Sequence, residues 1–460
     1  MKKKENNTLA GLARIFGYCV LLGSVGLLFS SATKEPGAFK NIDAAVSKND
    51  FNKAVEILKA AQNGKKPIYP EANAVSLYLD KGLLEHYAGN YDNSAQDLIE
   101  AERLIQEAFT KSVTAETASY IANDNTKEYP GEDYEDIYLS IFNALNFYNK
   151  GNTEEALVEI RRLTLSSGKL DMLSRKYEAS TKSAGDYLMN GLSKIGLQIN
   201  PQLPQGDPVN FSNSALARYL SVLFYLDDNN KDSARIESEQ IKAAFASNPK
   251  LYSNSIPKPV DNILTVPAGK ARLNIIGFTG LSPVKEEKVF VSIVPLDPPF
   301  GIMRLKLPVL KRRPSAIKRV EVEVRGQGKF ELELLEDMTA VTEETYNARF
   351  ANMFFKTYIR SLLKNAAGVI ASRSADKVGG TAGTIAGLGA RLGGKIAADA
   401  SERADIRMGR YFPDKAYVGA IDLEPGTYTV IVNFGGHTKE FNDVKVKANK
   451  INLIEAVSLQ

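Results

Sequence analysis

The chain of 460 residues has few of the side chains on which metal sites and many enzyme sites are built. It holds one cysteine, two histidines and no tryptophan. A single cysteine excludes an intrachain disulfide and a zinc site made of several thiolates. His86 and His437 lie in different halves of the sequence, so no local segment can supply a histidine-based zinc site. We therefore predict no metal ion and no cofactor.

Recognisable catalytic motifs are also missing. The sequence has no G-x-S-x-G nucleophile elbow, and its glycine-rich run at 389–394 continues with Lys395-Ile396 instead of the Lys-Ser/Thr of a phosphate-binding loop. Carboxylate pairs such as Glu286-Glu287 and Glu343-Glu344 have no identifiable acid/base partner. These absences favour a protein that is not an enzyme. The alternative is an envelope hydrolase acting on glycan or peptide, with carboxylates brought together from distant segments.

A strong excess of one charge is absent too. The net charge is +4, and most of it lies in the first 32 residues, which hold four basic residues against one acidic residue. The nearly neutral remainder argues against binding to nucleic acid. One basic run stands out at 304–319, as either a solvated connection between strands or a contact for an anionic partner or lipid. Its candidate contact residues are Lys311, Arg312, Arg313, Lys318 and Arg319.

The N-terminus is typical of a secretory signal over 1–32. A basic start precedes the apolar run from Phe16 to Phe29, and Ser30-Ser31-Ala32 forms a small-x-small cleavage site. The run is shorter than the roughly 20 residues of a membrane span, although a retained membrane anchor is the alternative. Cys19 follows a tyrosine inside the apolar run, which disfavours lipidation there. We expect export to the periplasm or to the membrane-associated cell envelope.

The first half, 40–250, contains four segments in which two amphipathic helical patterns flank a small residue or a short polar turn. Small residues at such positions let paired helices touch, as in stacked tetratricopeptide hairpins. The hairpins are unevenly spaced, so we predict a tetratricopeptide-like solenoid with insertions; a helical bundle without a groove is the alternative. The signature residues are Ala54, Gly82, Gly89, Tyr91, Ala144, Gly151, Ala156 and Ala234.

The second half has the sequence pattern of strands instead of paired helices. A linker with two prolines is expected at 251–262, and short runs with alternating apolar residues predict a sandwich-like β-rich domain over 263–460. A Gly/Ala-rich helical insert is expected at 338–408. Within it, Gly379, Gly383 and Gly387 recur every four residues, which suits close helix packing, a membrane-touching segment or an oligomer contact. The predicted fold class is α+β with several domains.

Three segments of the second half resemble one protein family. They are FTGLSPVKEEKVFVSI, ELLEDMTAVTEETYNARFANMFFKTYIRSLLKNAA and ERADIRMGRYFPDKAYVGAIDLEPGTYTVIV, in that order. Together with the helical pattern upstream, they resemble a widespread family of exported bacterial proteins with tetratricopeptide-like first halves. Its members are often lipoproteins, have no assigned activity, and are often encoded beside lipoproteins similar to the curli secretion channel. The resemblance covers most of 40–455 and implies an envelope location and an assembly partner, but no catalytic residue.

The sequence thus predicts a non-enzymatic scaffold or assembly protein of the bacterial cell envelope. Its hairpins would bind a protein partner, which the resemblance suggests is a curli-secretion-type lipoprotein. Besides the hydrolase, a lipid-binding or pore-associated module that uses 378–394 is an alternative. The sequence makes no prediction of the oligomeric state.

Overall fold

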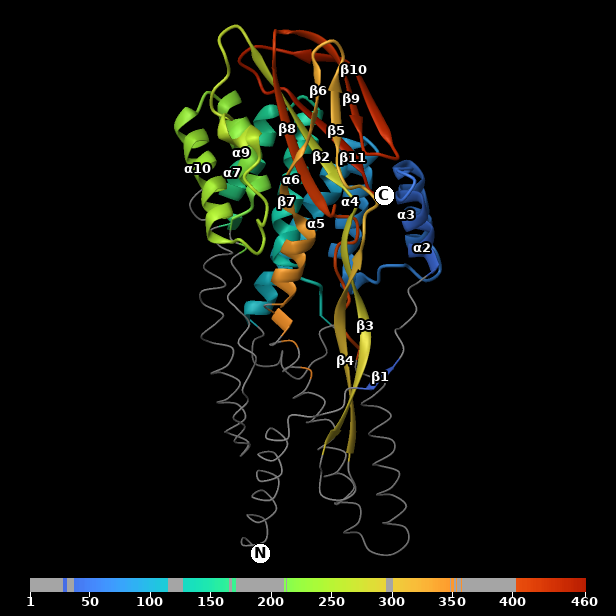
Figure 1. The fold of residues 1–460 in the computed structure, drawn as a ribbon. Helices are drawn as coiled ribbons and strands as arrows, with labels where there is room; N and C mark the ends of the chain where they lie inside the picture. Colours follow the sequence, from blue (N-terminus) through green and yellow to red (C-terminus); the bar gives the residue numbers. More distant parts are fainter. Residues whose placement is uncertain are drawn as a thin grey trace, which may run out of the picture.

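A computed structural model describes residues 28–30, 37–114, 127–164, 168–170, 211, 213–294, 301–347, 349–350, 353, 357 and 403–460. Paired helices form the first part of the chain and β-sheets the second (Figure 1). The prediction of a mixed α+β chain in this order is confirmed. Gly379, Gly383 and Gly387 lie outside the described residues, as does the segment 378–394.

The described residues of the first part include four helical hairpins. They pair α2 with α3, α4 with α5, α6 with α7, and α9 with α10. A short 3-10 turn, η1 (Glu71–Asn73), precedes α4. The helices are α2 (Gly37–Val46), α3 (Phe51–Gln62), α4 (Ala74–Tyr87), α5 (Tyr91–Thr114), α6 (Asp133–Asn149), α7 (Thr153–Thr164), α9 (Ala215–Asp227) and α10 (Lys231–Ser247).

All four hairpins turn in the same way. Each turn contains one residue with a left-handed backbone, with φ from 56° to 81°: Asn49, Gly89, Gly151 and Asn229. The next residue, always Asp or Asn, donates its backbone N–H to the carbonyl five residues earlier, at 2.8–3.0 Å. This bond satisfies a carbonyl that the ending helix leaves open. In three turns the same Asp or Asn side chain also caps the following helix, at 3.1–3.2 Å.

Small residues lie where the helices of a pair meet. Ala54, Ala156 and Ala234 are fully buried, and each comes four residues after the capping residue of its turn. Gly82 of α4 packs so closely on α5 that a Cβ atom there would lie 2.7 Å from the Leu98 side chain. Ala144 of α6 is fully buried as well. The short side chains are what permit this approach.

The strands of the described residues form three sheets, with the orders β11–β2–β8–β7, β10–β9–β5–β6 and β1–β3–β4. A short helix, α11 (Lys258–Asp261), precedes β2. The strands are β1 (Leu28–Ser30), β2 (Ala271–Thr279), β3 (Leu281–Val294), β4 (Gly301–Arg313), β5 (Glu321–Val324), β6 (Gly328–Glu331), β7 (Glu333–Asp337), β8 (Lys415–Leu423), β9 (Gly426–Asn433), β10 (Thr438–Val446) and β11 (Leu453–Ser458).

The sheet that contains β2 lies between the helices and the second sheet. Along β2, Leu273 and Ile275 belong to the core between the two sheets, whereas Ile276 and Phe278 belong to the core of the helices. This alternation is that of a strand buried on both faces. Helices and sheet therefore share one continuous apolar core, and α4, α6 and α9 contact the sheet directly.

The stretch expected to be a linker, 251–262, is part of this shared core. Leu251, Tyr252 and Val260 are at most 4% exposed, and all three belong to the helical core. Of the expected helical insert, 338–347 is helical, whereas its last residues, 403–408, have no regular secondary structure.

Candidate functional site at the base of the β3–β4 hairpin

The β3–β4 hairpin extends beyond the other described helices and sheets (Figure 1). Its base is fixed by both halves of the chain. Leu281 and Val284, at the start of β3, are buried in the helical core. The opposite strand is held by the helix at 338–347, where the Tyr346 hydroxyl donates to the carbonyl of Pro308 and Glu343 pairs with Arg312. The hairpin therefore starts from a rigid support.

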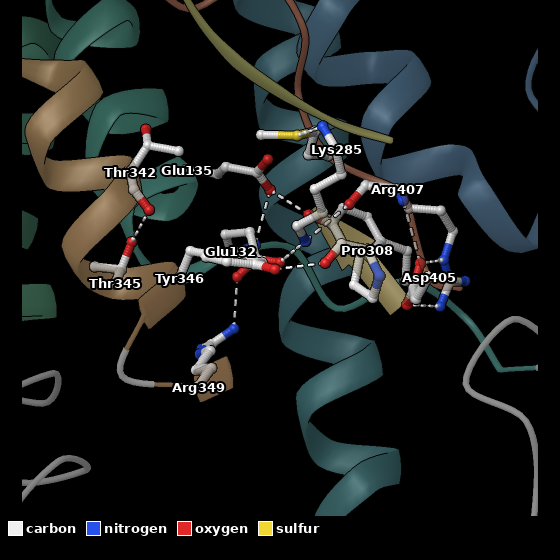
Figure 2. Close-up of polar contacts among 12 residues, drawn as sticks. Glu132, Glu135, Lys285, Pro308, Thr342, Thr345, Tyr346, Arg349, Asp405 and Arg407 are labelled. Carbon is white, nitrogen blue, oxygen red and sulfur yellow. Dashed lines mark hydrogen bonds and ion pairs between the residues drawn. The ribbon is translucent and has the colours of Figure 1, made fainter. Parts of the chain in front are cut away.

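Glu132, just before α6, is at the centre of a charged cluster at this base (Figure 2). Its carboxylate pairs with Lys285 of β3 and, at 2.7 Å, with Arg349, which also pairs with Asp133. Lys285 and Glu132 are 8% and 13% exposed, so solvent screens this pair less than a surface pair. These ion pairs join the start of α6, the hairpin and the helical residues 349–350 that follow the helix at 338–347.

An extended strap, residues 403–414, crosses the helices beside this cluster. Its Arg407 pairs with Asp405 at 2.7 Å and donates to the carbonyls of Ala72 and Lys127 at 3.0 and 2.6 Å (Figure 2 shows the Arg407–Asp405 pair). The Arg407 guanidinium also lies 5.2 Å from the centre of the Tyr129 ring. These contacts fix the strap to the segments that precede α4 and α6.

Two buried carboxylates bind the backbone of the strap. Glu135 accepts the N–H of Gly409 at 2.5 Å and the hydroxyl of Tyr129 at 2.9 Å, while Asp80 accepts the N–H of Arg410 at 2.5 Å. Burial raises the pKa of each carboxyl to about 7, although the backbone N–H donors favour the ionised form. Both side chains are fully buried, which suits a structural role in holding the strap.

Two further buried groups join the helices to the sheet. Glu336 of β7 accepts hydrogen bonds from Tyr138, Tyr252 and Ser214 at 2.8–2.9 Å, and burial raises its pKa. His86 of α4 lies 2.7 Å from Asn146 through Nδ1 and 2.7 Å from Glu455 of β11 through Nε2. These polar groups satisfy one another inside the core, as buried groups must.

The basic residues predicted as an anionic contact are mostly engaged within the protein. Lys311 pairs with Glu286 at 2.6 Å, Arg312 with Glu343, and Arg319 with Glu321 at 3.7 Å. The Nε of Arg313 donates to the Ser282 carbonyl at 2.8 Å, and burial lowers its pKa to about 10. Lys318 is exposed and lines a cavity of about 360 Å³.

That cavity also brings together three carboxylates from separate segments: Asp337, Glu343 and Asp414. Lys415 lies 2.6 Å from Asp414 and 3.8 Å from Asp337, and Arg312 pairs with Glu343. Burial raises the pKa of Asp337. The arrangement has the residue types of an acid/base site, but each carboxylate has a cationic neighbour.

Within the described residues, no group of three His, Cys, Asp or Glu side chains is placed to hold a metal ion. Nor does any described helix have the length and apolar character needed to cross a membrane. Comparisons with protein-family models, curated proteins and solved structures found no match to this chain.

Sequence reasoning missed the buried carboxylates Asp80, Glu135 and Glu336. A signal existed for one of them, because the side chains of Glu132 and Glu135 cap the start of α6 reciprocally, and acidic residues three apart before an apolar run suggest such a cap. Asp80 and Glu336 lie in apolar surroundings with no local motif. The strap residue Arg410, which binds Asp80, lies more than 250 residues away from it in the sequence. Tyr252, which binds Glu336, lies more than 80 residues away.

Proposed function

We propose that the protein is a non-enzymatic scaffold of the bacterial cell envelope, and that the β3–β4 hairpin is its contact for a protein partner. The observation that carries the proposal is the support at the base of the hairpin. Ion pairs, hydrogen bonds and core contacts from the start of α6, the strap and the helix at 338–347 converge on Leu281–Lys285 and on Pro308–Arg312; the strap contributes the Arg407 carbonyl, to which Lys285 donates at 3.3 Å. A strand pair of this length, held so firmly at one end, is suited to presenting a fixed surface to another protein.

We further propose that the helical hairpins are tetratricopeptide-like and serve as the frame of this scaffold. The shared turn geometry and the buried small residues support this assignment. The sheet and the strap cover the contact faces of α4, α6 and α9, so these faces are not open to a partner. The leader-like N-terminus and the family resemblance support the envelope location, and the resemblance suggests a curli-secretion-type lipoprotein as partner.

The test is crosslinking in the native envelope followed by purification of the protein with its partner. In the test variant, an Asn-Gly turn replaces residues 289–306; Lys288 and Leu307 face each other across the strands, so this turn can close the shortened hairpin. The matched control is Ile236→Lys on the outer helix α10, where Ile236 is 47% exposed. Circular dichroism would first establish that both variants fold.

We expect one partner to be recovered reproducibly with the wild type and the control, and lost with the shortened hairpin. If the partner is instead lost with Ile236→Lys and still recovered with the shortened hairpin, the partner binds the outer helices. If the wild type yields no reproducible partner, the scaffold proposal is wrong.

The cavity with Asp337, Glu343 and Asp414 favours the hydrolase as the second candidate. Hydrolysis of a glycan needs one protonated and one ionised carboxyl group across a cleft. Release of product from isolated envelope glycan or peptide, lost in an Asp337→Asn variant, would support this candidate. Equal release by the wild type and the variant would exclude Asp337 from catalysis.

A further inference from the structure

The outer edge of β3 is occupied by a strand from the very start of the described chain. β1 pairs with β3 in antiparallel orientation, with Leu28 opposite Val291, Phe29 opposite Phe290 and Ser30 opposite Val289. On its other side, β3 pairs with β4. In the described part of the chain, this sheet therefore has three strands, of which β1 is the shortest.

β1 lies within the segment that the sequence marks as a leader. Cleavage after Ala32 would remove it from the protein. Among the residues whose burial the structure describes, the two apolar cores begin at Phe39, so a chain beginning at Thr33 would keep every described core residue. It would lose the third strand of the β3–β4 sheet.

Loss of β1 would leave β3 with an open edge. A strand edge presents a row of backbone N–H and C=O groups that can pair with another chain, and a two-stranded hairpin is only marginally stable in water. A third strand would therefore stabilise the outer part of the hairpin. The pairing with β1 shows the orientation and register in which this edge takes one.

We infer that the β3 edge at Val289–Val291 accepts an extended, uncharged strand from the partner protein, antiparallel to β3. This inference rests on the proposed function and names the contact that the hairpin makes. The backbone ladder would supply affinity, and alternate side chains would supply specificity. The occupant is expected to be uncharged because β1 and the run Val289–Val294 contain no charged residue.

The first experiment tests the register in the full chain by disulfide formation. Cys19→Ser removes the only cysteine, so that Ser30→Cys and Val289→Cys report on this pair alone. Directly opposed residues have the Cα separation that a disulfide requires. The control pairs Ser30→Cys with Val291→Cys, two residues out of register and too distant to bridge. We expect a crosslink within the chain for the first pair only; equal crosslinking of both pairs, or of neither, would overturn the assigned register.

The second experiment tests whether the edge accepts a strand from another molecule. The probe is a fluorescent peptide with the sequence of residues 25–32, VGLLFSSA, extended by lysines for solubility. Its binding is measured to the chain beginning at Thr33, to the full chain, and to the full chain locked by the 30–289 disulfide. We expect binding to the first, binding at least about tenfold weaker to the second because the tethered β1 competes, and none to the third.

Equal binding to all three proteins, or no binding to the chain beginning at Thr33, would overturn the inference. Sedimentation of that chain with vesicles of phosphatidylethanolamine and phosphatidylglycerol, without peptide binding, would identify a lipid contact instead and would also overturn it. The proposed function would fail differently. If the envelope partner is captured equally by the open chain and the locked chain, the scaffold remains supported and only the strand contact is wrong.

Discussion

Replacement of Phe278 by alanine tests the shared core most directly. Phe278 is fully buried in β2, and its ring centre lies 5.2 Å from that of Phe142 in α6. β2 is flanked by β11 and β8, so the surroundings have little freedom to collapse into the space left behind. Loss of a buried phenylalanine side chain costs about 3 to 5 kcal/mol. We expect Phe278→Ala to fall at the upper end of this range.

The assay needs one signal from the helices and another from the sheets. Far-ultraviolet circular dichroism reports mainly on the helices. Because the chain has no tryptophan, Tyr428→Trp on β9 supplies a fluorescence signal from the second sheet alone. Urea unfolding is then followed by both signals in the background of Tyr428→Trp, with and without Phe278→Ala. The exposed Ile236→Ala serves as a control, with an expected change within about 0.5 kcal/mol.

If helices and sheet unfold as one unit, Phe278→Ala will lower both transition midpoints by the same amount. A shift in the fluorescence transition alone, with an unchanged helical transition, would refute the shared core. The helical half would then be an independently stable domain, as the predicted boundary at 251–262 implies.

Three smaller predictions follow from individual residues, each measured as a free energy of unfolding in urea. Gly151→Ala should cost about 1 to 2 kcal/mol because the backbone φ at this turn residue is +79°. Asn229→Gly, at the equivalent turn position with φ +56°, should be neutral or stabilising. Equal losses of stability in the two variants would contradict a left-handed backbone at these turns. Gly82→Ala should cost about 1 to 3 kcal/mol through overpacking against Leu98, and Gly82→Ala combined with Leu98→Ala should cost less than the sum of the two single changes. Burial raises the pKa of Asp80 to about 7, so the folded protein holds this proton more tightly than the unfolded chain does. The resulting contribution to the free energy of unfolding is fully present below about pH 4 and is lost as the pH rises through 7, by up to roughly 1.4 kcal/mol per pH unit. Asp80→Asn should flatten this dependence, and an unchanged slope would show that Asp80 is not its source.

The sequence was sufficient for the order of the helices and of most strands because periodicity is a local property. It missed β4, which occupies the first part of the basic run expected to be a connection between strands, and β1, which lies in the expected leader. Alternation of apolar residues marks β2 and β9, and the three- and four-residue steps mark the helices. It was insufficient for the packing of the two halves. Ile276 and Phe278 of β2 face the helices, but their apolar character alone does not show whether a helix or another sheet covers them.

The candidate site was the least predictable part. The cluster at the hairpin base joins Glu132 to Lys285 and Arg349, over separations of 153 and 217 residues. No spacing rule connects side chains at such distances. The buried carboxylates were hidden for a related reason, since Asp80 binds backbone groups of the strap, and backbone groups have no sequence signature.

The four hairpin turns, which share one geometry, have a consequence for where this chain can gain or lose residues. Each turn within a hairpin takes only three or four residues, whereas α3 and α4, α5 and α6, and α7 and α9 are separated in the sequence by residues 63–73, 115–132 and 165–214. In a stack of antiparallel helices, the first helix of each later pair begins at the end opposite the turns. The same end holds the starts of α4, α6 and α9, which contact the strap, the hairpin base and Glu336. One end of the frame is thus fixed by tight turns, while the other can take up added chain without disturbing a helix pair, beside the surface that we assign to the partner.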